Sequence, residues 1–533
     1  MHTIEPVVEP ANEHGMLYWF FRNSRDKLKN YYQAHRAKVI TLLVVVAALS
    51  FMLRAAIHPY VLLVRQKSFL LVLAICLVVI WFWAKRKRPL IKVVASTLVA
   101  LVAVAMFMWG GAVHDYVALY YRYKTLDIRE LNTLPITNHE RLQPVNSIYV
   151  LSHEATSEME SPQHPDFVRV GDEFRWTIAY EPAHFLPRFF QGRVKEIANV
   201  RADTPSPNFS QRDQVNFPVG ESLMLGRNSL TASIKRFGIW RYFHYEPTDV
   251  RVIKDDAGEW VQVVSLIRWK GLFFPRPEFG GVQVIRQEHS SLVGSLTLMF
   301  FGTGEWIRPE EIYQHRYLVG QNILGYEVSR YFANSFRFQS GFLGPMPGNH
   351  QGDVRVPDID DDLNEQPFTT YFEQVADRPG MLYHYFALEP FDPDKQGLNV
   401  SLFVPADGSG PTYVYKHFEK SGTLTGFSAI AAKIMDTRKD YDWTRHRPVE
   451  HRPFIRDING QRQFYVLTTI VTLKDGQTTG DEKPGQKSGF IAGTGANIVI
   501  TDAARNIPVW VSVNSNNWEE EIKKEVAKWG VNK

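Results

Sequence analysis

An acidic loop in the second half of the chain has the residue types that calcium binds. The stretch DVRVPDIDDDLNE, residues 353–365, places Asp358, Asp360 and Asp362 close together, and carboxylate oxygens are the hard ligands that Ca²⁺ prefers. It lacks the glycine and the glutamate that a helix-loop-helix calcium loop carries at its sixth and twelfth positions. The sequence therefore leaves two interpretations, a solvated acidic loop or a divalent-cation site. No other cofactor is expected.

A second polar cluster lies in RHRPVEHRP, residues 445–453. His446, Glu450 and His451 approach the spacing of a zinc protease, but the inverted motif needs one residue fewer between the first His and the Glu. Pro448 also prevents the helix that would place both imidazoles on one face. This pattern favours a polar strand edge or a protein contact over a metal site. The chain has no Gly-x-Ser-x-Gly elbow, and its scattered histidines form no recognisable triad.

The composition sets broad limits on fold and compartment. The chain has 533 residues, of which 45% are hydrophobic and 22% charged, with a formal charge of +4. This length allows several domains with ample cores. The small basic excess requires no nucleic-acid partner, because much of it flanks apolar stretches. Cys76 is the only cysteine, so an intrachain disulfide is excluded.

Three apolar stretches precede residue 114, at residues 39–57, 68–84 and 90–113. About 20 apolar residues are needed to cross a bilayer, so the pattern predicts three transmembrane helices, with two spans as the alternative. Short positively charged connections stay in the cytoplasm. The connection after the second stretch consists of Lys85, Arg86, Lys87 and Arg88. We therefore expect an integral inner-membrane protein with a cytoplasmic N-terminus and with residues after about 114 extracytoplasmic.

The rest of the chain has the pattern of antiparallel β-structure. Short alternating apolar runs are separated by Gly, Pro, Asp and Asn, which is typical of strands with tight connections. FVRVGDEFRWTIAYEP predicts two strands around Gly171 and Asp172, and a second pair is expected to turn at residues 407–410. The clearest helix is predicted for residues 308–338, where Pro309 and two acids suit a helix start.

Two segments share a pattern that indicates a duplicated unit. Residues 252–269, VIKDDAGEWVQVVSLIRW, and 454–471, FIRDINGQRQFYVLTTIV, both have an Asp-x-x-Gly turn followed by a long alternating strand. A later strand is expected after each, at GGVQVIRQ and ANIVITDA. The alternative is that such turns are common in β-rich proteins generally.

The predicted fold class is an N-terminal α-helical membrane anchor followed by a large α+β, mainly antiparallel β, extracytoplasmic region. The predicted segments are a basic and aromatic cytoplasmic arm (1–38), three transmembrane helices (39–113), a first β-rich module (114–300), a helix with a second β-rich module (301–513) and a C-terminal amphipathic helix (514–533).

The C-terminal helix is expected to have an apolar face that docks on another surface. In NNWEEEIKKEVAKWGVNK, Asn517 and Glu520 form a plausible capping box. The apolar side chains on one face of this helix are Trp518, Ile522, Val526 and Trp529. This face is expected to be buried, either on its own domain or on a neighbouring subunit.

These patterns favour a membrane-anchored extracytoplasmic scaffold or interaction protein in a bacterial or phage-derived envelope assembly. Its expected partners are the lipid bilayer, further copies of itself in a homo-oligomer, or other envelope proteins. The alternatives are a membrane-tethered, metal-assisted hydrolase of envelope material and an accessory subunit of a transporter or channel. The absence of a recognisable catalytic motif favours a protein that is not an enzyme.

Overall fold

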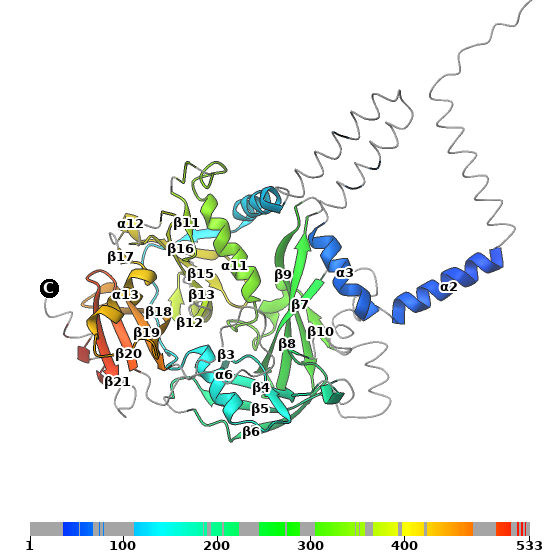
Figure 1. The fold of residues 1–533 in the computed structure, drawn as a ribbon, viewed down its shortest axis with the longest axis horizontal. Coiled ribbons are helices and arrows are strands. Elements are labelled where there is room, and N and C mark those ends of the chain that lie inside the picture. The colour runs from blue at the N-terminus through cyan, green and yellow to red at the C-terminus, as the bar shows by residue number, and fades with distance from the viewer. Residues whose placement is uncertain are drawn as a thin grey trace, which may run out of the picture. The chain divides into compact units, whose positions relative to one another are not determined.

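The computed structural model of this chain is mostly β-sheet (Figure 1). The structure describes residues 36–52, 54–67, 111–184, 186–188, 193–204, 207–222, 245–271, 274–287, 304–346, 348–350, 352–357, 366–392, 397–420, 424–472 and 497–512, with single residues 74, 78, 97, 520, 521, 524, 525 and 528. The chain divides into two units, Met1–Tyr60 and Val61–Lys533. The sheets of the second unit have a propeller-like arrangement.

Two helices are described near the N-terminus, α2 (Arg36–Met52) and α3 (Arg54–Gln66). The 17 residues of α2 extend about 25 Å, which is less than the roughly 30 Å of a hydrocarbon core. The sequence of α3 contains two arginines and a histidine. Within the described ranges, the structure has no helix that is both long and apolar enough to cross a membrane.

This finding overturns the predicted anchor of three transmembrane helices and the inner-membrane localisation that depended on it. The first predicted span, residues 39–57, is divided between α2 and α3. Nearly all of the other two, at 68–84 and 90–113, falls outside the described residues, as does the basic connection 85–88. Hydropathy predicted these spans, but a helix of about 20 residues is needed to cross a bilayer, and α2 has 17.

Two antiparallel sheets come first along the second unit. The β2–β6 sheet has the order β2-β4-β5-β6, with β3 paired to β4, and the β7–β10 sheet has the order β10-β9-β8-β7. Their strands are β2 (Glu160–Pro162), β3 (Asp166–Val170), β4 (Glu173–Pro182), β5 (Val194–Arg201), β6 (Arg212–Phe217), β7 (Tyr245–Lys254), β8 (Trp260–Lys270), β9 (Arg276–Arg286) and β10 (Glu305–Ile307). The predicted strand pair around Gly171 and Asp172 is the β3–β4 hairpin.

A six-stranded sheet follows, with the order β1-β16-β15-β13-β11 and β12 paired to β13. Only the β1–β16 pair in this sheet is parallel among the described strands. Its strands are β1 (Ile128–Glu130), β11 (Val354–Arg355), β12 (Phe368–Val375), β13 (Arg378–Pro390), β15 (Val400–Pro405) and β16 (Thr412–Lys416). A two-stranded sheet lies beside it, formed by β14 (Gly397–Leu398) and β17 (Leu424–Thr425).

The last sheet repeats the strand order of the β7–β10 sheet. It consists of β18 (His446–Ile458), β19 (Gln461–Thr472), β20 (Asn497–Asp502) and β21 (Ile507–Ser512), each paired with the next in sequence. The two segments that share an Asp-x-x-Gly turn form the β7–β8 and β18–β19 hairpins. In each sheet the third strand, β9 or β20, pairs with the second strand of that hairpin.

Short helices connect and cover these sheets. They are α6 (Val145–Glu154), the 3-10 helices η2 (Pro309–Gln314) and η3 (Phe336–Phe338), α11 (Tyr326–Ser335), α12 (His417–Lys420) and α13 (Phe427–Thr437). The single helix predicted over residues 308–338 is therefore wrong, since only its start at Pro309 and its second half are helical. Between them the backbone N–H groups of Ile323 and Leu324 donate to the Ala406 carbonyl, so this loop is anchored to the residue that follows β15 and does not continue the helix.

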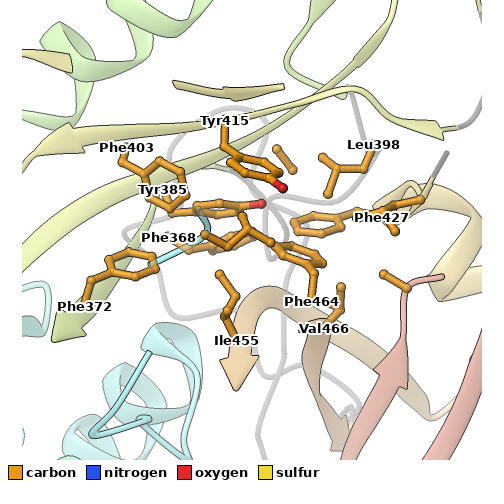
Figure 2. Close-up of a cluster of buried hydrophobic side chains, with 14 of the residues drawn as sticks. Phe368, Phe372, Tyr385, Leu398, Phe403, Tyr415, Phe427, Ile455, Phe464 and Val466 are labelled. Atoms are coloured by element: carbon orange, nitrogen blue, oxygen red, sulfur yellow. The ribbon is translucent and has the colours of Figure 1, made fainter. Parts of the chain in front are cut away.

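An aromatic core joins the six-stranded sheet to the β18–β21 sheet and α13 (Figure 2). Tyr385 and Phe403 come from the six-stranded sheet, Phe427 from α13, and Phe464 from β19. Each fully buried aromatic side chain of this kind stabilises the fold by roughly 1.5–3 kcal/mol. The two sheets are therefore held together by side chains whose partners lie far apart in sequence.

Candidate functional site

The residues predicted as sites from their sequence patterns fall outside the described part of the chain. These are Asp358, Asp360 and Asp362 of the acidic loop, Lys85 to Arg88, and Trp518, Ile522, Val526 and Trp529 of the C-terminal helix. Across the residues that are described, no group of three or more His, Cys, Asp or Glu side chains is arranged to hold a metal ion.

The polar cluster at residues 446–451 lies in β18 and is divided by a β-bulge. The pairing with β19 shifts register between Val449 and Arg452, and Glu450 adopts a left-handed φ of 49°. His451 then points into the core, where its Nδ1 lies 2.9 Å from the Thr468 hydroxyl. Glu450 instead pairs with Arg141 at 2.8 Å. The two side chains therefore serve different contacts.

A groove of about 1030 Å³ opens where three hairpin turns meet. The turns are β3–β4 at residues 171–172, β7–β8 at 255–258 and β12–β13 at 376–377, the last together with the start of β13. The loop 316–321 closes the fourth side. Its charged lining residues are Arg169, Asp172, Lys254, Asp255, Asp256, Arg316, Asp377 and Arg378. Four are acidic and four are basic, so the groove presents both signs of charge.

Hydrogen bonds hold the walls of the groove in place. The Asp255 carboxylate accepts the backbone N–H groups of Ala257 at 2.9 Å and Glu259 at 3.1 Å, and it pairs with Arg286. The Asp407 carboxylate accepts the N–H of Gly320 at 2.9 Å. The Asp255 and Asp407 carboxylates are therefore occupied in fixing turns. The charged lining residues that are exposed to solvent are Asp172, Asp256, Arg316 and Asp377.

Gln321 lies at the floor of the groove, and Asn322 belongs to the buried layer beneath that floor. The side-chain amide of Gln321 accepts the Arg169 N–H at 3.0 Å and donates to the Arg169 carbonyl at 2.6 Å. It thus satisfies both backbone groups of Arg169, as the backbone of a neighbouring strand does in a sheet. Asn322 is fully buried. Its Nδ2 donates to the Tyr326 hydroxyl at 3.1 Å, and its Oδ1 accepts from His384 Nε2 at 2.8 Å. The groove therefore rests on a hydrogen-bonded polar layer.

Arg251 supplies the charge of this layer. Its side chain is fully buried, with Nε 3.3 Å from Asp166 and Nη2 3.3 Å from Asp249. The guanidinium lies 5.2 Å from the Tyr326 ring centroid. Burial raises the pKa of Asp166 well above its ordinary value, against the opposing effect of Arg251. Burial, reinforced by the Arg251 charge, holds the pKa of His384 well below its ordinary value.

A second buried network has the residue types of a nucleophile and its base. Ser401 Oγ lies 2.8 Å from His417 Nε2 and 2.7 Å from the Tyr385 hydroxyl. Both Ser401 and His417 are fully buried in the six-stranded sheet region, and burial lowers the pKa of His417 to about 3. A general base needs a pKa near the working pH and access to substrate. This pair therefore has a structural role in the folded protein.

Arg251, Asn322 and His384 are not among the sites that the sequence patterns predicted. Arg251 and His384 each lie within a run of apolar strand residues, in TDVRVIK and MLYHYFAL. A charged or titratable residue inside such a run indicates a buried polar site, because the residue needs a hydrogen-bonding or charged partner when the strand is buried. Asn322 carried no such signal, since it lies in a loop.

No family model, curated protein or solved structure matches this chain. The function is therefore inferred from the groove and the layer beneath it.

Proposed function

We propose that this protein is an interaction module that binds a polypeptide segment of a partner protein in the groove at the three hairpin turns. The observation that carries the proposal is the charge of the lining, with four acidic and four basic side chains around one opening. Complementary charge selects partners and sets binding register. A polypeptide segment that carries both Lys or Arg and Asp or Glu would match this lining.

The size of the groove supports an extended ligand. Pockets for small molecules are typically about 300–1,000 Å³, and this groove, with about 1030 Å³, is at the upper end of that range and has charged side chains around its opening. The apolar part of the groove lining includes the side chains of Tyr317, Val319 and Met381. A polar chain segment would contact these while its charged side chains meet the rim.

The groove is also preorganised. Its turns are fixed by Asp255 and Asp407, and its floor by Gln321. A site that is already ordered loses little conformational entropy on binding. Hairpin turns on a rigid sheet are places where proteins commonly carry binding residues.

A photo-crosslinking residue at Val319 tests this proposal. Val319 lines the groove and is 37% exposed, whereas Ile507 on β21 is 49% exposed and outside it. In intact cells, we expect the crosslinking residue at position 319 to form an adduct of one defined mass with a partner protein. The same residue at position 507 should form no adduct of that mass. The substitution Arg316→Glu is expected to reduce the adduct roughly fivefold, as losing about 1 kcal/mol of charge attraction would.

Two results would contradict the proposal. One is an identical set of adducts from positions 319 and 507, which would indicate random collisions. The other is an adduct from 319 that Arg316→Glu and Asp256→Lys leave unchanged, since the charged rim would then play no part. Mass spectrometry of the adduct distinguishes a second copy of this chain from another protein.

A further inference from the structure

A smaller cavity lies away from the groove, beside the bulge in β18. It has about 20 Å³ of space and opens between residues 138–141, β12 and the β18–β19 hairpin. Its inner wall includes Arg141, Arg452 and Leu467, and its outer part includes Asn138 and Tyr371. The volume suits a single small species, because one water needs roughly 10–15 Å³ measured this way.

Two buried arginines meet at this cavity. Arg141 is 5% exposed and Arg452 is 4% exposed. Arg141 pairs with Glu450 at 2.8 Å, and the same carboxylate lies 3.8 Å from Arg452. One carboxylate therefore serves two guanidinium groups.

The nearby charges leave a positive excess. Glu140 also lines the cavity, but it pairs with Arg456 at 2.8 Å. Within these ion pairs three arginines thus meet two glutamates, which leaves one positive charge. Glu373 lies at the exposed side, where it accepts a hydrogen bond from Asn138 at 3.0 Å. Burial lowers the pKa of Arg452 to about 9, an effect that Glu450 opposes and Arg141 reinforces. An uncompensated buried charge is costly, and a counter-ion lowers that cost.

Both arginines also have an unused donor. Arg141 Nε and Arg452 Nε are buried without a hydrogen-bond partner, and the Arg452 Nε lies 3.8 Å from Glu450 Oε2, beyond hydrogen-bond distance. The other groups of Arg452 are occupied, since Nη1 donates to the Arg141 carbonyl and Nη2 donates to Thr469 Oγ1 at 2.7 Å. Buried N–H donors in folded proteins are almost always satisfied, so the unpaired Nε groups indicate that a further acceptor belongs here.

We propose that this cavity binds a single monovalent anion of the size of chloride, held by Arg141 and Arg452. The anion accepts hydrogen bonds from the unused donors and neutralises the excess positive charge. A water molecule would satisfy the donors but not the charge. The space of about 20 Å³ suits one small ion. This site is independent of the groove and does not depend on the proposed function.

Thermal unfolding of the full-length protein tests the site. Unfolding is followed in sodium chloride and in sodium gluconate at equal concentration and pH, from 1 to 200 mM. We expect a saturable rise in Tm of roughly 1–2 °C in chloride alone. Arg452→Gln should abolish the difference between the two salts. The matched control Arg438→Gln removes an arginine that pairs with Asp440 at the surface and should keep the full difference.

A second measurement does not depend on a variant that folds. Crystals of the unaltered protein grown with sodium bromide should show an anomalous peak between Arg141 and Arg452. The proposal is overturned if Tm is the same in both salts, or if the cavity contains density without an anomalous signal. A chloride effect of equal size in Arg452→Gln also overturns it, because the ion would then bind elsewhere.

Discussion

The imidazole of His384 donates a hydrogen bond from Nε2 to the side-chain oxygen of Asn322 over 2.8 Å, with both residues fully buried. The two residues are 62 positions apart in sequence. The bond therefore ties β13 to the loop that forms the floor of the groove. Tyr326 extends the network, because its hydroxyl accepts from Asn322 and lies 3.3 Å from Thr369 Oγ1.

Asn322→Ala should destabilise the protein by about 2–3 kcal/mol, because it leaves the His384 donor buried without a partner. Urea unfolding measures the change. The control Gln314→Ala alters an exposed amide and should change the free energy of unfolding by less than about 0.5 kcal/mol. Equal effects of the two substitutions would show that the Asn322 bond contributes nothing specific.

Arg251→Met should cost about 3–5 kcal/mol, since it leaves the buried Asp166 without its cation. The matched substitution Asp249→Asn removes the partly exposed partner, whose side chain is 37% accessible, and should cost about 1 kcal/mol or less. Denaturant unfolding of both variants provides the comparison. If Arg251→Met is as stable as the unaltered protein, the ion pair can be replaced by packing alone.

Stability should fall as pH decreases from about 6.5, because His384, His417 and His451 are buried in the neutral form. Burial lowers the pKa of both His417 and His451 to about 3 and the pKa of His384 well below its ordinary value. Below pH 6.5 the unfolded chain binds protons on these histidines and the folded chain does not. The free energy of unfolding therefore falls by up to about 1.4 kcal/mol per pH unit for each histidine.

Buried carboxyls oppose this trend at the acidic end. Burial raises the pKa of Asp166 and Glu389 in the folded protein, so the folded state binds those protons first and gains stability as pH falls towards 4.

His451→Gln isolates the effect of one histidine. It should reduce the slope of the unfolding free energy against pH, between pH 6 and pH 5, by about 1.4 kcal/mol per pH unit. An unchanged slope would mean that His451 is protonated in the folded state.

Gly220→Ala should destabilise the protein by about 2 kcal/mol or more through overpacking. A Cβ at this position would lie 2.2 Å from Glu181 Oε1 and 2.6 Å from Gln163 Nε2, and Glu181 is buried in hydrogen bonds to Gln163 and the Ser222 N–H. Gly111→Ala is the matched control, because a Cβ there has nothing within 4 Å. Residues 111–125 are helical, so this substitution should stabilise the protein by about 0.5–1 kcal/mol. Similar thermal shifts in both variants would contradict the steric argument.

Calcium binding by the acidic loop remains a prediction from the sequence. Isothermal titration of the full-length, chelator-treated protein should give heat on calcium addition that is lost when Asp358, Asp360 and Asp362 are all replaced by Asn. Addition of excess chelator should then reverse any calcium-dependent rise in Tm. A titration without heat, in calcium and in magnesium alike, would leave the solvated loop as the correct interpretation.

Local chemistry determined the hairpins. The β3–β4 turn at Gly171 and the β15–β16 turn at residues 407–410 follow from glycine and aspartate between alternating apolar runs. The same reasoning failed for residues 308–338, where helical propensity was overridden because Ile323 and Leu324 bond to Ala406. It failed again for the transmembrane anchor, since hydropathy does not determine where a helix ends.

Sequence alone therefore determined the β-rich character of the chain and the positions of its tight turns, because these depend on neighbouring residues. The groove, the Arg251 layer and the anion cavity required the tertiary structure. Arg141 and Glu450 lie 309 positions apart yet form an ion pair at 2.8 Å. Such pairs depend on which sheet faces pack together, and the type of a residue does not identify its partner.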